Sequence, residues 1–200
     1  MDINLPGFIP AILPVVLSPG ASFTLAMNSA LSGGRRGLVA TLTGTALGIY
    51  THALLIGLGI TSLLVASPGF FSLLKVAGML YMLWLGGQLI RSGLNAGSLT
   101  FGRNGPEVSV KAAYLANVLN PKAILLYLTV VSQFAGKQGE VSHYLLLASV
   151  HIVIMTIWLC AASRLLLYSA VNRDTRLLKK IIDTGGGLAL ILFALLNAFS

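Results

Sequence analysis

The sequence has few charged residues, and this scarcity defines its class. Asp, Glu, Lys and Arg together make up 9% of the 200 residues, while hydrophobic residues make up 56%. A soluble domain carries about 25% charged residues, so this chain lacks the side chains needed to cover a water-facing surface. We therefore expect an integral membrane protein that has lipid as much of its solvent.

The residues on which most enzymes and metal sites depend are also scarce. The single cysteine, Cys160, excludes an intrachain disulfide, a C-x-x-C pair and a Cys-based metal site. The three histidines and five acids show neither H-E-x-x-H nor H-x-x-E-H spacing, so we predict no metal and no cofactor. The phosphate-binding sequence G-x-x-x-x-G-K-[ST] is absent too, which argues against ATP hydrolysis. We expect a protein that is not an enzyme.

Long apolar runs predict an all-α fold with six transmembrane helices. A spanning helix needs about 20 mostly apolar residues. The expected spans are 7–31, 38–65, 69–91, 112–135, 141–163 with an extension to about 168, and a sixth from about Ile181. A polar stretch at 92–110, rich in Gly, Ser and Asn, is predicted to be a cytoplasmic linker. The chain is then one transmembrane domain, with a first half at 1–91 and a second half at 111–200.

The basic residues predict the orientation of these spans. Ten of the thirteen fall in the first, third and fifth connections, and positive residues collect on the cytoplasmic side, so both termini should be periplasmic. This placement also explains the net charge of +8 without a nucleic-acid partner. The ten residues are Arg35, Arg36, Arg91, Arg103, Lys111, Arg164, Arg173, Arg176, Lys179 and Lys180.

The two halves are predicted to be inverted repeats. Each half has three spans, an odd number, so the second half must enter the membrane from the opposite side. Residues 17–21 (Leu-Ser-Pro-Gly-Ala) parallel residues 119–123 (Leu-Asn-Pro-Lys-Ala), and His52 parallels His151. Inverted repeats are frequent in transporters. Gly44-x-x-x-Gly48 and Gly185-Gly186-Gly187 are expected to allow close helix packing.

Two prolines, Pro19 and Pro121, lie near the middle of the first and fourth spans. A proline inside a helix removes a backbone hydrogen bond and clashes with the preceding turn. Ser18 and Asn120 can satisfy the freed groups, and Gly20 adds local freedom. One interpretation is a pair of broken helices whose half-helix N-termini face a central cavity. The other is a pair of simple kinks, which membrane helices tolerate.

Lys122 and the two span histidines are the ionisable candidates for a site. A charge at mid-membrane usually faces a cavity or a partner, and Lys122 follows a helix break, so a substrate carboxylate is a natural counter-charge. Snorkelling of Lys122 is the alternative. His52 and His151 either relay protons and line the cavity, or bridge helices as neutral groups. Asp183 is the nearest acid and is expected close to the cytoplasmic end of the sixth span.

Four motifs are spread along the chain: Ser18-Pro19-Gly20, Ser32-Gly33-Gly34-Arg35-Arg36-Gly37, Leu74-Lys75-x-x-Gly78-x-x-Tyr81-x-x-Trp84-Leu85-Gly86 and Asn117-x-x-Asn120-Pro121-Lys122-Ala123. Taken together, these motifs resemble the LysE/RhtB family of bacterial amino-acid exporters over nearly the whole chain. The chain departs from the family at Ala21-Ser22, where many members continue Pro-Gly with Pro-Asn or Pro-Asp, and this changes the polarity beside the expected cavity.

The resemblance implies a bacterial inner-membrane exporter of amino acids or close derivatives, driven by protons. Because no acid lies at mid-span to pair with a second positive charge, we expect a neutral substrate such as threonine, homoserine or leucine. A passive channel and a membrane thiol-redox carrier are the alternatives, one cysteine arguing against the latter, and a homodimer is left open. The expected substrate-binding residues are Ser18, Pro19, Gly20, Ala21, Ser22, Asn117, Asn120, Pro121 and Lys122.

Overall fold

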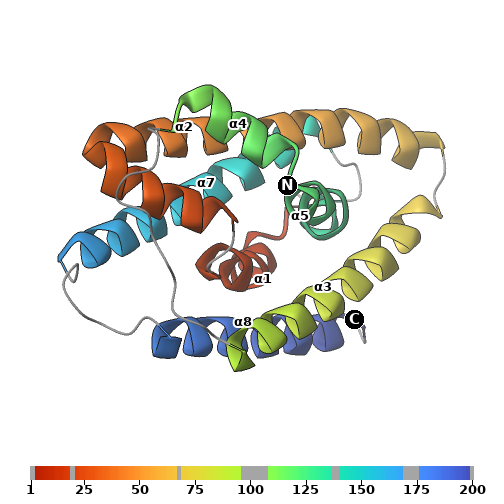
Figure 1. Cartoon of the computed structure of the whole chain (residues 1–200). Coiled ribbons are helices and arrows are strands. Elements are labelled where there is room, and N and C mark those ends of the chain that lie inside the picture. The colour runs from red at the N-terminus through yellow and green to blue at the C-terminus, as the bar shows by residue number, and fades with distance from the viewer. Residues whose placement is uncertain are drawn as a thin grey trace.

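The computed structural model is a helical bundle and describes residues 3–18, 21–66, 69–95, 108–136, 140–168 and 176–198 (Figure 1). Most of the linker expected at 92–110 lies outside these residues. The all-helical membrane class predicted from composition is confirmed. The helices are α1 (Leu5–Leu17), α2 (Ala21–Ala66), α3 (Phe70–Leu94), α4 (Val110–Val118), α5 (Pro121–Leu125), the π-helix η1 (Leu126–Val131), α6 (Ser132–Phe134), α7 (Val141–Tyr168) and α8 (Arg176–Ala198).

Helix α2 contains a reversal at Gly34, which joins two helical arms. Gly34 has φ 57° and ψ −138°, a conformation that a residue without a side chain adopts at low cost. Helix α2 therefore has one arm from Ala21 to the reversal at Gly34 and a second arm from there to Ala66.

The helix breaks predicted at Pro19 and Pro121 share one local feature, an extended residue before the proline, whereas Pro10 and Pro14 are accommodated inside α1. Ser18, which ends α1, has φ −67° and ψ 132°. Asn120, which precedes α5, has φ −78° and ψ 111°. Both residues precede a proline, whose ring disfavours the helical conformation of the residue before it. The second break bends the chain by 59° between α4 and the helix that follows.

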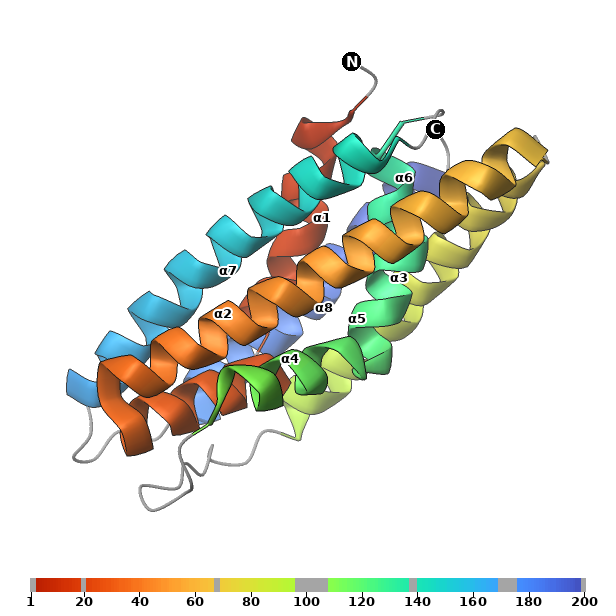
Figure 2. The same ribbon diagram turned by 90° about the horizontal axis from the view of Figure 1, so that it is seen from above.

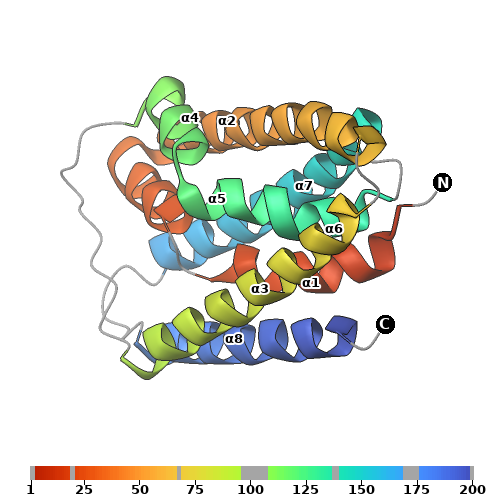
Figure 3. The same cartoon turned by 90° about the vertical axis from the view of Figure 1, so that its right-hand side faces the viewer.

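The ends of the bundle agree with the predicted alternation of the connections. The starts of α1, α3 and α7 and the ends of α2 and α8 lie at one end (Figures 2 and 3). The Gly34 reversal, the end of α3, the start of α4, the end of α7 and the start of α8 lie at the other. We call this second end the cationic end, after its exposed residues Arg35, Arg36, Arg91, Lys111, Arg164 and Lys180.

Length and composition alone identify fewer spans than the sequence predicts. In the described ranges, two stretches are long and apolar enough to cross a membrane, Ser22–Gly59 and Val141–Leu165, and the bent pair Val110–Val118 with Lys122–Phe134 would make a third. The helices Leu5–Leu17 and Asp183–Leu196 are apolar but shorter. Helix α8 begins at Arg176, before the expected Ile181, because a helix can continue past the apolar core into water. The count of six spans stays a prediction.

Gly44, Gly48 and Gly187 make the close helix contacts predicted for the glycine motifs, whereas nothing lies within 4 Å of a Cβ at Gly185. A side chain at Gly44 would collide with the carbonyl oxygen of Val110 on α4, and a Cβ at Gly48 would lie 2.6 Å from Asn117 Oδ1. A Cβ at Gly187 on α8 would likewise meet the Gly86 carbonyl oxygen on α3 at 2.5 Å. Small residues therefore allow α2 to pack on α4 and α3 to pack on α8 at backbone distance.

We expect Gly48→Leu to destabilise the folded protein by about 1–3 kcal/mol or more, because the new side chain must displace Asn117. Gly59→Leu on the same helix is the matched control, since nothing lies within 4 Å of a Cβ at that position. Thermal unfolding in detergent measures the difference. Equal melting temperatures for the two variants would show that the α2–α4 contact is not close-packed.

Candidate functional site

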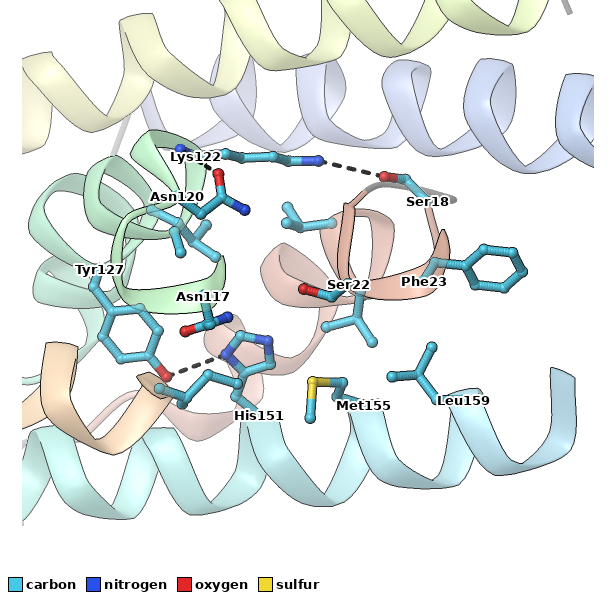
Figure 4. A pocket seen from close by; sticks show the side chains of 15 residues that line it. Ser18, Ser22, Phe23, Asn117, Asn120, Lys122, Tyr127, His151, Met155 and Leu159 are labelled. Carbon is cyan, nitrogen blue, oxygen red and sulfur yellow. Dashed lines mark hydrogen bonds between the residues drawn. The ribbon is translucent and has the colours of Figure 1, made fainter. Parts of the chain in front are cut away.

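The two helix breaks meet inside the bundle. Lys122, one residue after the break at Asn120 and Pro121, donates a hydrogen bond from Nζ to Ser18 Oγ over 3.4 Å (Figure 4). Ser18 is the residue that ends α1, and its side chain is buried. The two partners are 104 residues apart, so this contact joins the break in the first half of the chain to the break in the second.

The backbone of Lys122 is fixed on both sides. Its N–H donates to Asn120 Oδ1 at 3.0 Å, which is a helix N-cap interaction. Its carbonyl oxygen accepts a hydrogen bond from the Tyr81 hydroxyl of α3, also at 3.0 Å. Because the main chain is held by α3 and by the cap, the side chain is directed towards α1.

A cavity of about 90 Å³ lies beside this contact. Six of the predicted site residues line it: Ser18, Ser22, Asn117, Asn120, Lys122 and His151. Pro19 and Gly20 lie outside the residues that the structure describes, and Ala21 and Pro121 are the first residues of α2 and α5. The remaining lining residues are Val15, Val16, Phe23, Ile49, Ala123, Leu126, Tyr127, Met155 and Leu159.

Lys122 is the one Lys, Arg, Asp or Glu among these lining residues. A single ammonium in a mostly apolar cavity is a strong attractor for an anionic group, since electrostatic interactions are weakly screened there. Within the described ranges, no group of three or more His, Cys, Asp or Glu side chains is placed to hold a metal ion. The cavity therefore has the chemistry of a binding site for a small anion or zwitterion.

Asp183 on α8 is the one buried acid among the described residues. It is 2% exposed, and its Oδ2 accepts a hydrogen bond from Ser92 Oγ at 2.7 Å. Ser92 is near the end of α3, so the carboxylate lies towards the cationic end. Asp183 does not line the cavity.

The two span histidines have different surroundings, although the sequence gives them parallel positions. His151 lines the cavity, and its Nδ1 is 3.1 Å from the Tyr127 hydroxyl. His52 is absent from the cavity wall, and its Nε2 lies 3.3 Å from the Asn117 carbonyl oxygen. The contacts of His52 connect α2 to α4, which is the helix-bridging arrangement. Of the two, His151 is the one that lines the cavity.

Tyr127 lines the cavity, although it belongs to none of the motifs that the sequence analysis singled out. Its ring lies between the two histidines, with centroids 5.9 Å from each. It belongs to the π-helix η1, where Ser132 Oγ donates to the Tyr127 carbonyl oxygen at 3.0 Å. Short π-helical segments are frequent at functional sites. The sequence carries no clear signal for one, so Tyr127 could have been found only through its position five residues after Lys122.

Helix α7 presents one side to the cavity and another to its surroundings. His151, Met155 and Leu159 recur every four residues and all line the cavity, as expected for one face of an α-helix. Val153 and Ile157 on the same helix are 57% and 66% exposed. Along the chain direction of α7, this face begins with the polar His151 and continues with the apolar Met155 and Leu159.

The match to known proteins covers nearly the whole chain. Residues 13–199 match the LysE type translocator family. The chain belongs to this family. The resemblance inferred from its motifs is thus confirmed, and the protein is a membrane transporter and not an enzyme.

Relatives of this translocator include efflux proteins of enteric bacteria. It is 31% identical over 189 residues to the homoserine/homoserine lactone efflux protein of Salmonella typhimurium strain LT2, covering 90% of this chain and 89% of that protein. It is 28% identical over 186 residues to the leucine efflux protein of Enterobacter sp. strain 638, covering 90% and 86%. An uncharacterized membrane protein of Bacillus subtilis strain 168, YrhP, is 24% identical over 98% of this chain and 99% of its own length. No solved structure matches this chain.

We expect cysteines on the cavity face of α7 to react with a small water-soluble thiol reagent, because alternating access must admit water to the site. On a Cys160→Ala background, Met155→Cys should be modified and Ile157→Cys should not, since the latter faces lipid. Mass spectrometry of the labelled protein in membranes measures the modified fraction. Modification of Ile157→Cys alone would place the water path on the wrong side of the helix.

Proposed function

We propose that this translocator exports neutral amino acids, or close derivatives of them, from the cytoplasm, and that inward proton movement drives the export. The observation that carries the proposal is Lys122, a single ammonium held between two broken helices at the wall of the cavity. The names of two relatives, efflux proteins for homoserine and its lactone and for leucine, support amino-acid substrates.

The substrate carboxylate is expected to bind Lys122 Nζ and the hydroxyl of Ser18. Helix α2 begins at Ala21, so free backbone N–H groups and the positive end of its dipole lie beside the break and favour an anion. Asn120 and Asn117 also line the cavity and supply amide groups for the rest of the backbone of the substrate. The Lys122–Ser18 hydrogen bond is long at 3.4 Å. The ammonium is therefore free to donate a shorter hydrogen bond to a substrate carboxylate.

The charges favour a zwitterion with an uncharged side chain. One carboxylate can be matched by Lys122, while the substrate ammonium can be met by amide, hydroxyl and imidazole groups. A lysine or arginine substrate would bring a second full positive charge beside Lys122, and no acid lines the cavity among the described residues. Asp183 lies outside the wall and is hydrogen-bonded to Ser92.

Six spans in two inverted halves would bring the two breaks together at one depth. The first span would combine α1 with the first arm of α2, and the fourth would combine α4 with the helices from α5 to α6. Discontinuous helices of this kind hold the substrate in many transporters. The alternation of the connections and the basic residues at the cationic end support a cytoplasmic placement of that end, with both termini periplasmic.

His151 is our candidate for the coupling proton. Its ring lines the same small cavity as Lys122. A protonated His151 and a substrate ammonium would therefore repel each other, because both would be cations in a cavity that already contains the Lys122 ammonium. Proton binding would then expel the substrate and substrate binding would expel the proton, which is the exchange that proton-driven export requires.

We expect Lys122→Gln to lower neutral amino-acid efflux by at least about tenfold, because loss of one partner of a buried charged contact typically costs 2–5 kcal/mol. Lys122→Arg should restore part of the activity, since the planar guanidinium keeps the charge but not the shape. Lys180→Gln, at the exposed cationic end, should export normally. Efflux of labelled amino acids from loaded cells or vesicles measures these rates, and a protonophore should abolish uphill efflux but not passive flow through a channel.

The double variant Lys122→Gln/Asp183→Asn separates transport from folding. It removes both charges, so it should be as stable as the native protein or more so, yet remain inactive. Unchanged neutral efflux in Lys122→Gln would remove Lys122 from the site. Export of lysine or arginine without any neutral amino acid would refute the charge argument.

The proposed orientation predicts which engineered cysteines an impermeant thiol reagent can reach. On the Cys160→Ala background, Asn4→Cys should be labelled from outside intact cells, because the N-terminus should be periplasmic. Asn104→Cys in the linker should be labelled only after the cells are opened. The reverse pattern would invert the topology.

A further inference from the structure

The wall of the cavity changes in character along α7. At the His151 end it also contains Tyr127 and Asn117, and further along α7 come Met155 and then Leu159 (Figure 4). In the same view, Met155 and Leu159 lie across the cavity from Lys122 and Ser18. A substrate whose carboxylate is held by Lys122 would therefore meet thioether and isobutyl groups on the opposite wall.

Phe23 extends this apolar wall onto α2. It lines the cavity and stacks on Trp158 of α7, with ring centroids 6.2 Å apart and an interplanar angle of 28°. Because the aromatic pair links the two helices, Phe23 is held in place from behind. The wall made by Phe23, Met155 and Leu159 thus comes from two helices, and we call it the apolar wall.

We infer that the apolar wall is the subsite for the substrate side chain, so that the preferred substrate is a neutral amino acid with an aliphatic side chain of about the size of leucine. This inference rests on the proposed export function and adds the class of side chain. Dispersion and the removal of apolar surface from water favour an aliphatic group there. A hydroxyl placed against these three side chains would lose its hydrogen bonds to water.

Ser22 is the polar group that could reverse this preference. It lines the cavity and directly precedes Phe23 in the chain. If the substrate carried a side-chain hydroxyl, as homoserine does, Ser22 would be its natural hydrogen-bond partner. If the substrate is aliphatic, Ser22 remains beside the carboxylate site at the start of α2, and its hydroxyl contributes nothing to the choice of side chain.

The test compares leucine with homoserine in one assay. The purified protein is reconstituted into vesicles, and the vesicles are loaded with each labelled amino acid. The ratio of kcat/KM for leucine to kcat/KM for homoserine is then measured. The native protein should prefer leucine. Met155→Thr and Leu159→Asn should each lower the ratio by at least about tenfold, which is the lower range for loss of one methylene group in an apolar pocket. Val153→Ala and Ile157→Ala, on the lipid-facing side of α7, should leave the ratio unchanged.

Two further variants keep the result interpretable. Met155→Leu preserves apolar volume and should keep the preference for leucine even if the polar substitutions prevent folding. Ser22→Ala should affect the export of both substrates to the same extent, because Ser22 lies beside the carboxylate site. A native preference for homoserine, or a loss of homoserine export in Ser22→Ala with no effect of Met155→Thr and Leu159→Asn, would overturn the inference while leaving neutral amino-acid export intact. Absence of export for both substrates would instead reject the proposed function.

Discussion

The burial of one positive charge, the ammonium of Lys122, constrains the rest of this structure. A lysine at the centre of a spanning helix costs about 2.5–3.5 kcal/mol on insertion scales. The hydroxyl of Ser18 reduces that cost because it accepts a hydrogen bond from the ammonium, while Tyr81 and Asn120 hold the backbone of Lys122. These contacts tie Lys122 to the end of α1, to α3 and to the start of α5.

The prolines make that arrangement possible. In an unbroken helix the backbone N–H groups would be hydrogen-bonded within the helix. The direction of the chain at Lys122 would also differ, so its side chain would not meet Ser18. Because Ser18 and Asn120 precede prolines, both adopt extended conformations, and each break ends one helix and begins another within the bundle. The glycine contacts of α2 with α4 then let Asn117 approach closely enough to line the same cavity. Local backbone rules and close packing act together to place the site.

The sequence indicated the position of the site through residue types that are rare in it, and gave no indication of the site residues whose types are common. The breaks could be recognised because similar segments, Ser18-Pro19 and Asn120-Pro121, recur in the two halves, and Lys122 because charges are unusual in membrane spans. Six predicted site residues do line one cavity. Tyr127, Met155 and Leu159 could not be recognised, since an aromatic or aliphatic residue in a span is ordinary and its facing depends on how the helices pack. The number of spans and the roles of the site residues remain predictions.

The two halves repeat the same break but not the same chemistry. Ser18 and Asn120 have equivalent places before their prolines, yet a glycine follows Pro19 while Lys122 follows Pro121. His151 lines the cavity, whereas His52, its counterpart, bonds to the Asn117 carbonyl oxygen. A symmetric pair of lysines would place two ammonium groups in one small cavity, where their repulsion would be weakly screened. An amino acid has one carboxylate and one ammonium, so a cavity between two related halves can be complementary to it only if the halves differ at these positions.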